Sequence, residues 1–264
     1  MDVLTPRTLD EALRLRADRH GAVPIQGGTD LMVELNFDRR RPDAVLDLGE
    51  VEELRGWSRE NGALRLGASL TYAEAMEEPL RSLLPALAEA SRTVGSPQIR
   101  NRGTIGGNLG TASPAGDALP PLLVEEAEVE LASASGSRRL ALDEFLVGPK
   151  RNALAPDELI VSVHLRPSGA SQTFMKVGPR NAMVIAVCSL AVAVDRDRDE
   201  LRAAFGSAGP VPALVRARLG DADGFPALVA SAASPIDDVR GTAAYRRHAL
   251  RVLTVRGLER CLAA

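Results

Sequence analysis

Residues 98–117 read QIRNRGTIGGNLGTASPAGD, and this stretch is the most informative part of the chain. It places the glycine pair Gly106–Gly107 between Thr104 and Asn108. Paired glycines let the backbone approach a bound ligand closely, and successive N–H groups in such a turn form a concave anion site. Loops of this length inside a compact domain are often functional. We therefore expect residues 95–117 to form a long ligand-binding loop.

A second glycine pair lies near the N-terminus, in the segment 25–31, which reads IQGGTDL. It follows a short apolar run, residues 22–25, that predicts a strand. A single Gly-Gly after a strand is more often a plain turn. Two separate Gly-Gly-Thr/Asn loops, however, suit a dinucleotide pyrophosphate better than either suits a turn. Neither loop matches GxxxxGK[ST], which excludes a Walker phosphate site, and neither is the GxGxxG that opens a Rossmann βαβ unit.

The composition excludes several classes of protein. The chain has 264 residues, 45% of them hydrophobic, so it is long enough to bury a hydrophobic core. Its formal net charge is −3, so it lacks the overall positive charge that would attract nucleic acid or an anionic membrane. Its two cysteines, Cys188 and Cys261, cannot supply a zinc finger or a four-thiolate iron–sulfur cluster. No export signal or membrane span is recognisable, so we expect a soluble, cytoplasmic protein.

The rest of the chain predicts alternating helices and strands. Capping boxes at Thr8–Glu11 and Thr71–Glu74 each predict the start of a helix. Strict alternation in residues 158–165 predicts a strand with one apolar face, formed by Leu159, Val161, Val163 and Leu165. Other segments predict helices at 80–91 and 243–262, a hairpin around 129–142, and strands at 44–48, 63–68, 174–194 and 201–205. Residues 168–171 read as a boundary.

Two details within the glycine-rich stretch have alternative interpretations. Ser113 before Pro114 is a common helix start, but the same turn also places Asp117 where it can accept hydrogen bonds from sugar hydroxyls. Arg102 is interpreted equally well as a solvated loop charge and as a ligand contact.

With these residues in place, the chain resembles one known family. Residues 98–117 are similar to the signature of the FAD-binding medium subunit of the molybdenum hydroxylases, which include xanthine dehydrogenase and aerobic carbon monoxide dehydrogenase. Residues 27–30 resemble that family's first pyrophosphate loop. Later blocks also resemble the family and extend the likeness over nearly the whole chain: residues 148–160, 176–183 and 245–248.

The resemblance implies an α+β fold. Its parts are a two-part FAD-binding domain of the vanillyl-alcohol-oxidase (PCMH) type and a small C-terminal α/β domain of the carbon monoxide dehydrogenase flavoprotein type. On this basis we expect FAD-binding subdomain 1 at residues 1–55, FAD-binding subdomain 2 at residues 56–167 and the C-terminal α/β domain at residues 168–264.

The resemblance also implies a function. The chain would be the flavoprotein subunit of a molybdenum hydroxylase, an oxidoreductase, passing electrons from iron–sulfur clusters of a partner through FAD to an acceptor such as NAD or a quinone. A molybdopterin-binding large subunit and a small subunit with two-iron, two-sulfur clusters would be its partners in a hetero-oligomer. A stand-alone FAD-dependent reductase of the same fold and a flavin-free scaffold subunit are the alternatives.

The resemblance assigns cofactor-binding residues but no catalytic or metal-binding ones. The glycine loops would hold the pyrophosphate through backbone amides, Asp117 the ribityl or ribose region, and Ile160 would pack on the flavin. Lys176 would stabilise the reduced flavin by its charge. The full set is Ile25, Gln26, Gly27, Gly28, Thr29, Asp30, Leu31, Thr104, Ile105, Gly106, Gly107, Asn108, Asp117, Ile160 and Lys176. No histidine or cysteine lies in either loop, which predicts non-covalent FAD.

Two further positions are notable. Lys176 and Lys150 are the only lysines among 32 basic residues, and both fall in family-like blocks, although Lys150 has no assigned role. Val184 stands where several relatives carry an aspartate, in a block associated with access of a nicotinamide acceptor. The electron acceptor, the substrate of the whole enzyme and the stoichiometry of the assembly therefore stay open.

Overall fold

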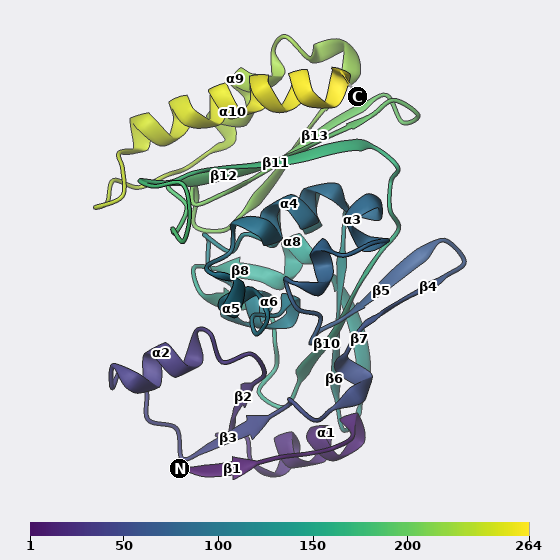
Figure 1. The fold of residues 1–264 in the computed structure, drawn as a ribbon, viewed down its shortest axis with the longest axis vertical. Helices are drawn as coiled ribbons and strands as arrows, with labels where there is room; N and C mark the ends of the chain where they lie inside the picture. Colours follow the sequence, from purple (N-terminus) through teal and green to yellow (C-terminus); the bar gives the residue numbers. More distant parts are fainter. Residues whose placement is uncertain (264) are drawn as a thin grey trace.

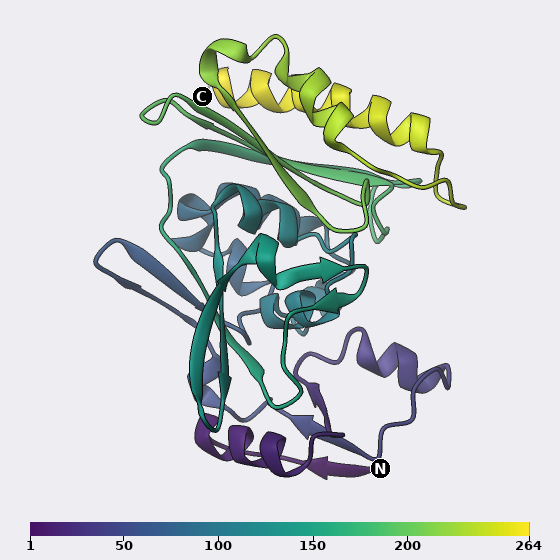
Figure 2. The ribbon, with the colours of Figure 1, turned by 180° about the vertical axis from the view of Figure 1, so that it is seen from behind.

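The three larger sheets are stacked along the long axis of the molecule in the computed structural model, which describes residues 1–263 (Figure 1). The N-terminal sheet lies at one end and the C-terminal sheet, with its two helices, at the other. Between them lies a five-stranded sheet together with a group of short helices (Figure 2). Within these residues, every helix is too short or too polar to cross a lipid bilayer.

The N-terminal sheet is parallel, with strand order β1-β3-β2. The helix expected after the first capping box is confirmed, because Thr8 Oγ1 accepts a hydrogen bond from the N–H of Glu11. This helix packs against the sheet through Ala12. The elements of this part are β1 (Asp2–Leu4), α1 (Leu9–Asp18), β2 (Val23–Ile25), α2 (Leu31–Asn36), β3 (Ala44–Asp47) and the 3₁₀ turn η1 (Glu52–Leu54).

The five-stranded sheet is antiparallel, with order β4-β5-β10-β6-β7. Its strands are β4 (Trp57–Glu60), β5 (Ala63–Gly67), β6 (Glu128–Ser133), β7 (Gly136–Ala141) and β10 (Leu159–Leu165), which confirms the predicted hairpin and the alternating strand. The prediction that the four apolar residues of β10 share one face is wrong, however. A bulge interrupts the pairing with β6 between Ile160 and Ser162, and the four residues divide between two cores.

Short helices cover this sheet and end where the sequence breaks them. The helix expected at 80–91 is split in two, because Pro85 disfavours helical geometry at Leu84. The capping box at Thr71–Glu74 forms as predicted but leads only into a 3₁₀ turn. These elements are η2 (Glu74–Met76), α3 (Leu80–Leu83), α4 (Pro85–Thr93), α7 (Leu119–Val124), α8 (Leu142–Phe145) and the hairpin β8 (Leu146–Gly148) and β9 (Arg151–Asn152).

The stretch at 95–117 is not the long loop that its glycines suggested. It contains α5 (Pro97–Arg100) and α6 (Ile105–Thr111). Thr104 caps α6 by accepting the N–H of Gly107, Ile105 and Leu109 anchor it in the core, and Ala112 ends it in the left-handed region at φ 46°. A good cap and two buried side chains outweigh the low helix propensity of its three glycines. No helix starts at Ser113, whose hydroxyl closes a turn with Ala115 N–H.

The C-terminal sheet is an antiparallel meander, β11-β12-β13-β14. Helices cover both faces, α9 and α10 on one and α4 and α7 on the other, so every residue of β12 is buried. This double cover explains the apolar run near residue 190. The elements are β11 (Ser171–Val177), β12 (Cys188–Asp195), β13 (Glu200–Gly206), β14 (Ala213–Arg218), η3 (Leu219–Asp221), α9 (Phe225–Ala232) and α10 (Ala243–Ala263).

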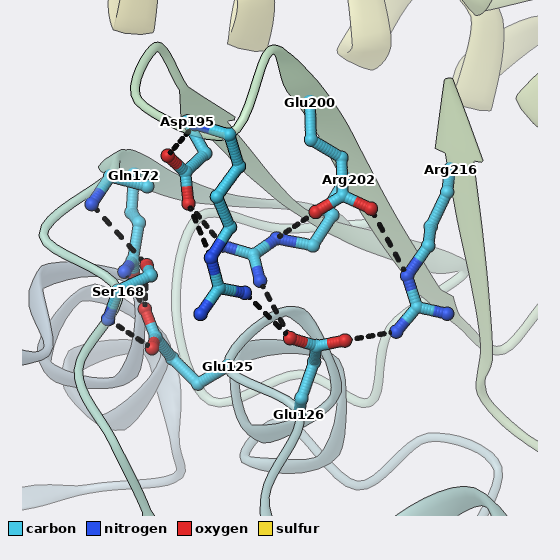
Figure 3. Close-up of polar contacts among 10 residues, drawn as sticks. Glu125, Glu126, Ser168, Gln172, Asp195, Glu200, Arg202 and Arg216 are labelled. Carbon is cyan, nitrogen blue, oxygen red and sulfur yellow. Dashed lines mark hydrogen bonds and ion pairs between the residues drawn. The ribbon is translucent and has the colours of Figure 1, made fainter. Parts of the chain in front are cut away.

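Polar contacts fasten α7 to the C-terminal sheet at its C-terminal end (Figure 3). Glu125 accepts hydrogen bonds from the N–H and hydroxyl of Ser168, at 2.9 and 3.0 Å. Glu126 pairs with Arg198 at 3.0 Å, with the buried Arg202 at 3.1 Å, and with Arg216. Charged hydrogen bonds to a buried guanidinium are strong and directional. They fix how the C-terminal sheet sits on the rest of the molecule.

Candidate functional site

A cavity of about 480 Å³ lies between the N-terminal sheet and α6. The loop after β2, the turn after β5, the β8–β9 hairpin and the start of β10 complete its wall. The structure brings most of the predicted site residues to this one cavity, although the two glycine loops are more than 70 positions apart. Those lining it are Ile25, Gln26, Gly27, Gly28, Thr29, Asp30, Leu31, Thr104, Gly106, Gly107, Asn108 and Ile160.

The loop at residues 27–31 offers unused backbone donors to the cavity. Within residues 1–263, none of its five N–H groups donates a hydrogen bond to the protein. Gly28 makes the turn possible by adopting φ +72°. Successive free amides around such a turn form an anion site. This loop can therefore bind the phosphates of a dinucleotide.

The loop at residues 104–108 differs, because its amides are already used. Ile105 N–H donates to Leu70 O at 2.9 Å, and Gly106 N–H donates to Ala68 O at 2.8 Å. The N–H groups of Gly107 and Asn108 both donate to Thr104. The expectation that amides of both loops hold the ligand is thus corrected for the second loop, which forms a rigid wall instead.

The glycines of the two loops serve two different purposes. A Cβ on Gly27 would lie 1.8 Å from Arg102 O, and one on Gly106 would lie 2.6 Å from Ala68 O. These two glycines therefore allow protein segments to pack together. A Cβ on Gly107 would meet only the Thr104 hydroxyl, at 3.1 Å. Gly107 instead keeps space open on the cavity side.

Unpaired polar atoms in and behind the wall point to a ligand. Ser69 Oγ and Asn108 Oδ1 line the cavity, are buried and have no hydrogen-bond partner within residues 1–263. Buried polar groups in proteins nearly always have a partner, and leaving one unpaired is costly. A bound molecule with hydroxyl or N–H groups would supply the missing partners.

Three predicted residues lie outside the cavity wall. Ile105 is fully buried in the core. Asp117 and Lys176 form a buried ion pair at 2.6 Å, with side chains 10% and 6% exposed. Burial raises the pKa of Asp117, and the nearby Lys176 partly offsets this rise. Gly116 lies against the Asn108 amide, so the pair sits immediately behind the wall rather than in it.

Several lining residues were missed by sequence reasoning or left unassigned. Lys150 lines the cavity and adopts φ 54° at the tip of the β8–β9 hairpin. Asn152 of this hairpin donates to Gly110 O at 3.0 Å, and Lys150 N–H donates to Ala112 O at 3.0 Å. The hairpin thus completes the C-terminal end of α6. Ser69 and Tyr72 also line the cavity, and no ligand-binding motif marks either of them.

The flanking arginines have structural roles. Arg100 Nη1 donates to Val94 O at 3.0 Å. Arg102 Nη2 reaches Gln26 O at 3.5 Å and does not line the cavity.

A serine, histidine and glutamate cluster on β10 and β6 does not have the geometry of a nucleophile triad. Ser162 Oγ and Glu130 Oε2 both lie near the same ring nitrogen, His164 Nε2, at 2.8 and 2.7 Å. A triad needs the hydroxyl and the carboxylate on opposite ring nitrogens. The cluster is also absent from the cavity wall.

The cavity wall contains no histidine or cysteine among the described residues. Both cysteines are buried elsewhere, and burial raises the pKa of Cys188 to about 12 and that of Cys261 to about 11. Their thiols stay protonated and unreactive near neutral pH. These facts support the prediction of non-covalent FAD, which stays a prediction.

Comparison with known proteins decides the family. A family model described as the FAD binding domain in molybdopterin dehydrogenase matches residues 1–167. The chain belongs to this family. The FAD cofactor, the oxidoreductase class and the fold expected from the sequence are confirmed.

Individual relatives agree with this assignment. A putative xanthine dehydrogenase FAD-binding subunit from Escherichia coli strain K12 is 32% identical, covering 97% of this chain and 94% of the relative. The nicotinate dehydrogenase FAD-subunit of Eubacterium barkeri is 38% identical over 74% of this chain and 69% of its own. Among solved structures, the reconstituted CO dehydrogenase from Oligotropha carboxidovorans has a TM-score of 0.93, 25% identity, and coverage of 100% and 98%.

Proposed function

We propose that this chain is the electron-transfer flavoprotein subunit of a multi-subunit molybdenum hydroxylase. It would receive electrons from iron–sulfur clusters on a partner and pass them to an acceptor such as NAD or a quinone. The observation that carries the proposal is the single cavity formed by both glycine loops, with five free amides on one side and unpaired polar atoms on the other. Its residues fit a dinucleotide that is anionic at its centre and hydroxylated beside it.

Each part of the wall would hold a different part of FAD. The amides of residues 27–31 would bind the pyrophosphate, while Asn108 and, behind it, Asp117 would accept hydrogen bonds from hydroxyl groups. Ile160 would contribute an apolar contact to the ring system, since its Cδ1 lies in the wall close to Gly110. Bound FAD supplies chemistry that no amino-acid side chain has, the interconversion of one- and two-electron transfer.

An iron–sulfur electron donor would lie on a partner subunit. A two-iron, two-sulfur cluster needs four protein ligands, typically thiolates, and this chain has two cysteines, both in the C-terminal core. Relatives include the carbon monoxide dehydrogenase medium chain of Hydrogenophaga pseudoflava and a glyceraldehyde dehydrogenase medium chain of Sulfolobus acidocaldarius. We therefore propose a molybdopterin-binding large subunit and an iron–sulfur small subunit as partners.

We also propose a division of the chain that follows its three larger sheets. Residues 1–55 and 56–167 would form the two parts of the FAD-binding domain, and residues 168–264 the C-terminal domain. The N-terminal sheet and the five-stranded sheet fall in separate ranges, and each range contributes residues to the cavity wall, which supports the first boundary.

Co-purification tests the proposed function. The chain, tagged and expressed at native level in its own host, should isolate with a larger and a smaller subunit, with molybdenum and iron in the complex and flavin on this chain. Reduction of the complex by its substrate, followed by NAD or a quinone, then identifies the acceptor. A chain that isolates alone with flavin and reduces a substrate would instead be a stand-alone reductase. A complex without flavin would make it a scaffold subunit.

A further inference from the structure

The turn after β5, residues 68–72, is held rigidly against the start of α6. Ala68 O and Leu70 O accept the N–H groups of Gly106 and Ile105, and Tyr72 N–H donates to Gly103 O at 3.1 Å. This backbone pairing fixes two side chains of the turn, Ser69 and Tyr72, in the wall of the cavity. Neither belongs to the glycine loops.

Both side chains carry hydroxyl groups and are buried. Ser69 is 4% exposed and Tyr72 is 5% exposed. Ser69 Oγ is a buried oxygen with no hydrogen-bond partner within residues 1–263. A buried hydroxyl without a partner destabilises the folded state, so a protein retains it where something else completes it. Ser69 Oγ is such a group, and Tyr72 lies in the same cavity wall, so this turn points to a ligand.

The surroundings of Tyr72 define the chemistry of that ligand. Burial, and then the carboxylates of Asp117 and Asp30, raise the pKa of Tyr72, so its hydroxyl stays protonated and can donate. Asn108 Oδ1 in the wall and Asp117 Oδ1 behind it are unpaired acceptors. A hydroxyl group can both accept a hydrogen bond from Tyr72 and donate one to the unpaired oxygens, whereas an ionised phosphate can only accept. A polyhydroxylated chain fits these groups.

We propose that Ser69 and Tyr72 bind the hydroxylated ribityl chain of FAD. The proposal rests on the placement of FAD in this cavity given above, and it adds a division of labour. The amides of residues 27–31 bind the anionic centre of the molecule, and the hydroxyl groups on the turn after β5 bind its polyol. The ribityl chain then contacts Ser69 and Tyr72 on the turn and Asn108 on the neighbouring helix α6.

The test uses the full chain freed of flavin, with Ser69→Ala and Tyr72→Phe, which remove only the hydroxyl groups. The matched controls are Ser58→Ala and Tyr245→Phe, whose side chains are exposed. FAD affinity is measured by quenching of flavin fluorescence, and ADP affinity by calorimetry, because ADP has the pyrophosphate and a ribose but no ribityl chain. Unfolding temperatures are recorded with and without FAD.

We expect each variant to bind FAD about three- to tenfold more weakly, the range for loss of one hydrogen bond. ADP affinity should not change. Without ligand the unfolding temperature should stay the same or rise, because a buried hydroxyl group has been removed. A structural role would instead lower it.

Three results would overturn the proposal alone: unchanged FAD affinity, an equal loss of ADP affinity, or a lower unfolding temperature without ligand. The placement of FAD itself fails separately. It fails if the unsubstituted chain does not bind FAD, or if Gly107→Val, which fills the cavity, binds FAD normally.

Discussion

Replacing Gly107 by valine should abolish FAD binding while the chain stays folded. A Cβ at this position meets only the Thr104 hydroxyl, at 3.1 Å, so the added methyl groups project into the cavity rather than into protein. They occupy space that the ligand needs, and the neighbouring backbone cannot retreat, because Gly106 N–H is bonded to Ala68 O. Flavin absorbance of the purified chain measures the effect, and we expect FAD affinity to fall at least about 100-fold, or about 3 kcal/mol.

Two matched substitutions separate filling of the cavity from damage to the fold. Gly220→Val places the same side chain at an exposed position with nothing within 4 Å, and it should leave flavin content unchanged. Gly106→Ala should damage the fold itself, since its Cβ would lie 2.6 Å from Ala68 O. Normal flavin occupancy in Gly107→Val would refute the assignment of this wall to FAD.

The second large effect is expected at the buried ion pair. Lys176→Met should lower the free energy of unfolding by about 3–5 kcal/mol, because it leaves the Asp117 carboxylate buried without a counter-charge. Denaturant unfolding of the flavin-free chain measures this loss. Lys150→Met is the matched control, since Lys150 is exposed and forms no ion pair within residues 1–263. The double variant Lys176→Met/Asp117→Leu should regain most of the stability, because it removes both charges.

The loss in Lys176→Met should also depend on pH. Burial already raises the pKa of Asp117 in the folded state, and Lys176 opposes that rise, so removing the lysine raises the pKa further. A carboxyl group whose pKa is raised by folding favours the folded state at low pH, and that contribution is lost as the pH rises through the folded-state value. The destabilisation should therefore be small near pH 4 and grow toward pH 8. A loss independent of pH would show that Asp117 is not the cause.

The pair also changes how Lys176 is interpreted. Sequence resemblance placed it as a cation beside the flavin, whereas its ammonium group contacts Asp117 and Thr93 O and does not line the cavity. It comes from β11, while Asp117 precedes α7, so the pair joins the C-terminal sheet to the start of that helix. Glu125 and Glu126 fasten the other end of α7 to the same sheet (Figure 3). The influence of Lys176 on FAD would pass through Asp117.

Local sequence signals predicted those elements that depend on local physics. The capping hydroxyl of Thr8 starts α1, and the apolar alternation in residues 158–165 marks β10. The glycines of α6 misled the prediction, because its stability comes from Thr104 and from the burial of Ile105 and Leu109 by distant segments. The bulge in β10 depends on its pairing with β6 and has no signal in β10 itself.

The candidate site also depends on contacts between distant segments, which the sequence does not reveal. The composition of the sequence identified both glycine loops. It did not predict that the first loop keeps its N–H groups free, whereas the second loop uses them in hydrogen bonds to the protein. That difference arises because the turn at residues 68–72 pairs with the start of α6. The unpaired hydroxyl of Ser69 and the place of Tyr72 in the cavity wall could not be foreseen, since a serine or tyrosine after a strand is most often solvated or paired. Pairing is a property of the folded chain.

A crystal structure of the full chain with bound FAD is the sharpest test of the site. Flavin density should lie in the cavity between the loop at residues 27–31 and α6, with the pyrophosphate within hydrogen-bonding distance of the free amides of that loop. The N–H groups of residues 105–108 should keep their bonds to the protein. FAD bound elsewhere on the chain, or a pyrophosphate held by the amides of α6, would contradict this assignment.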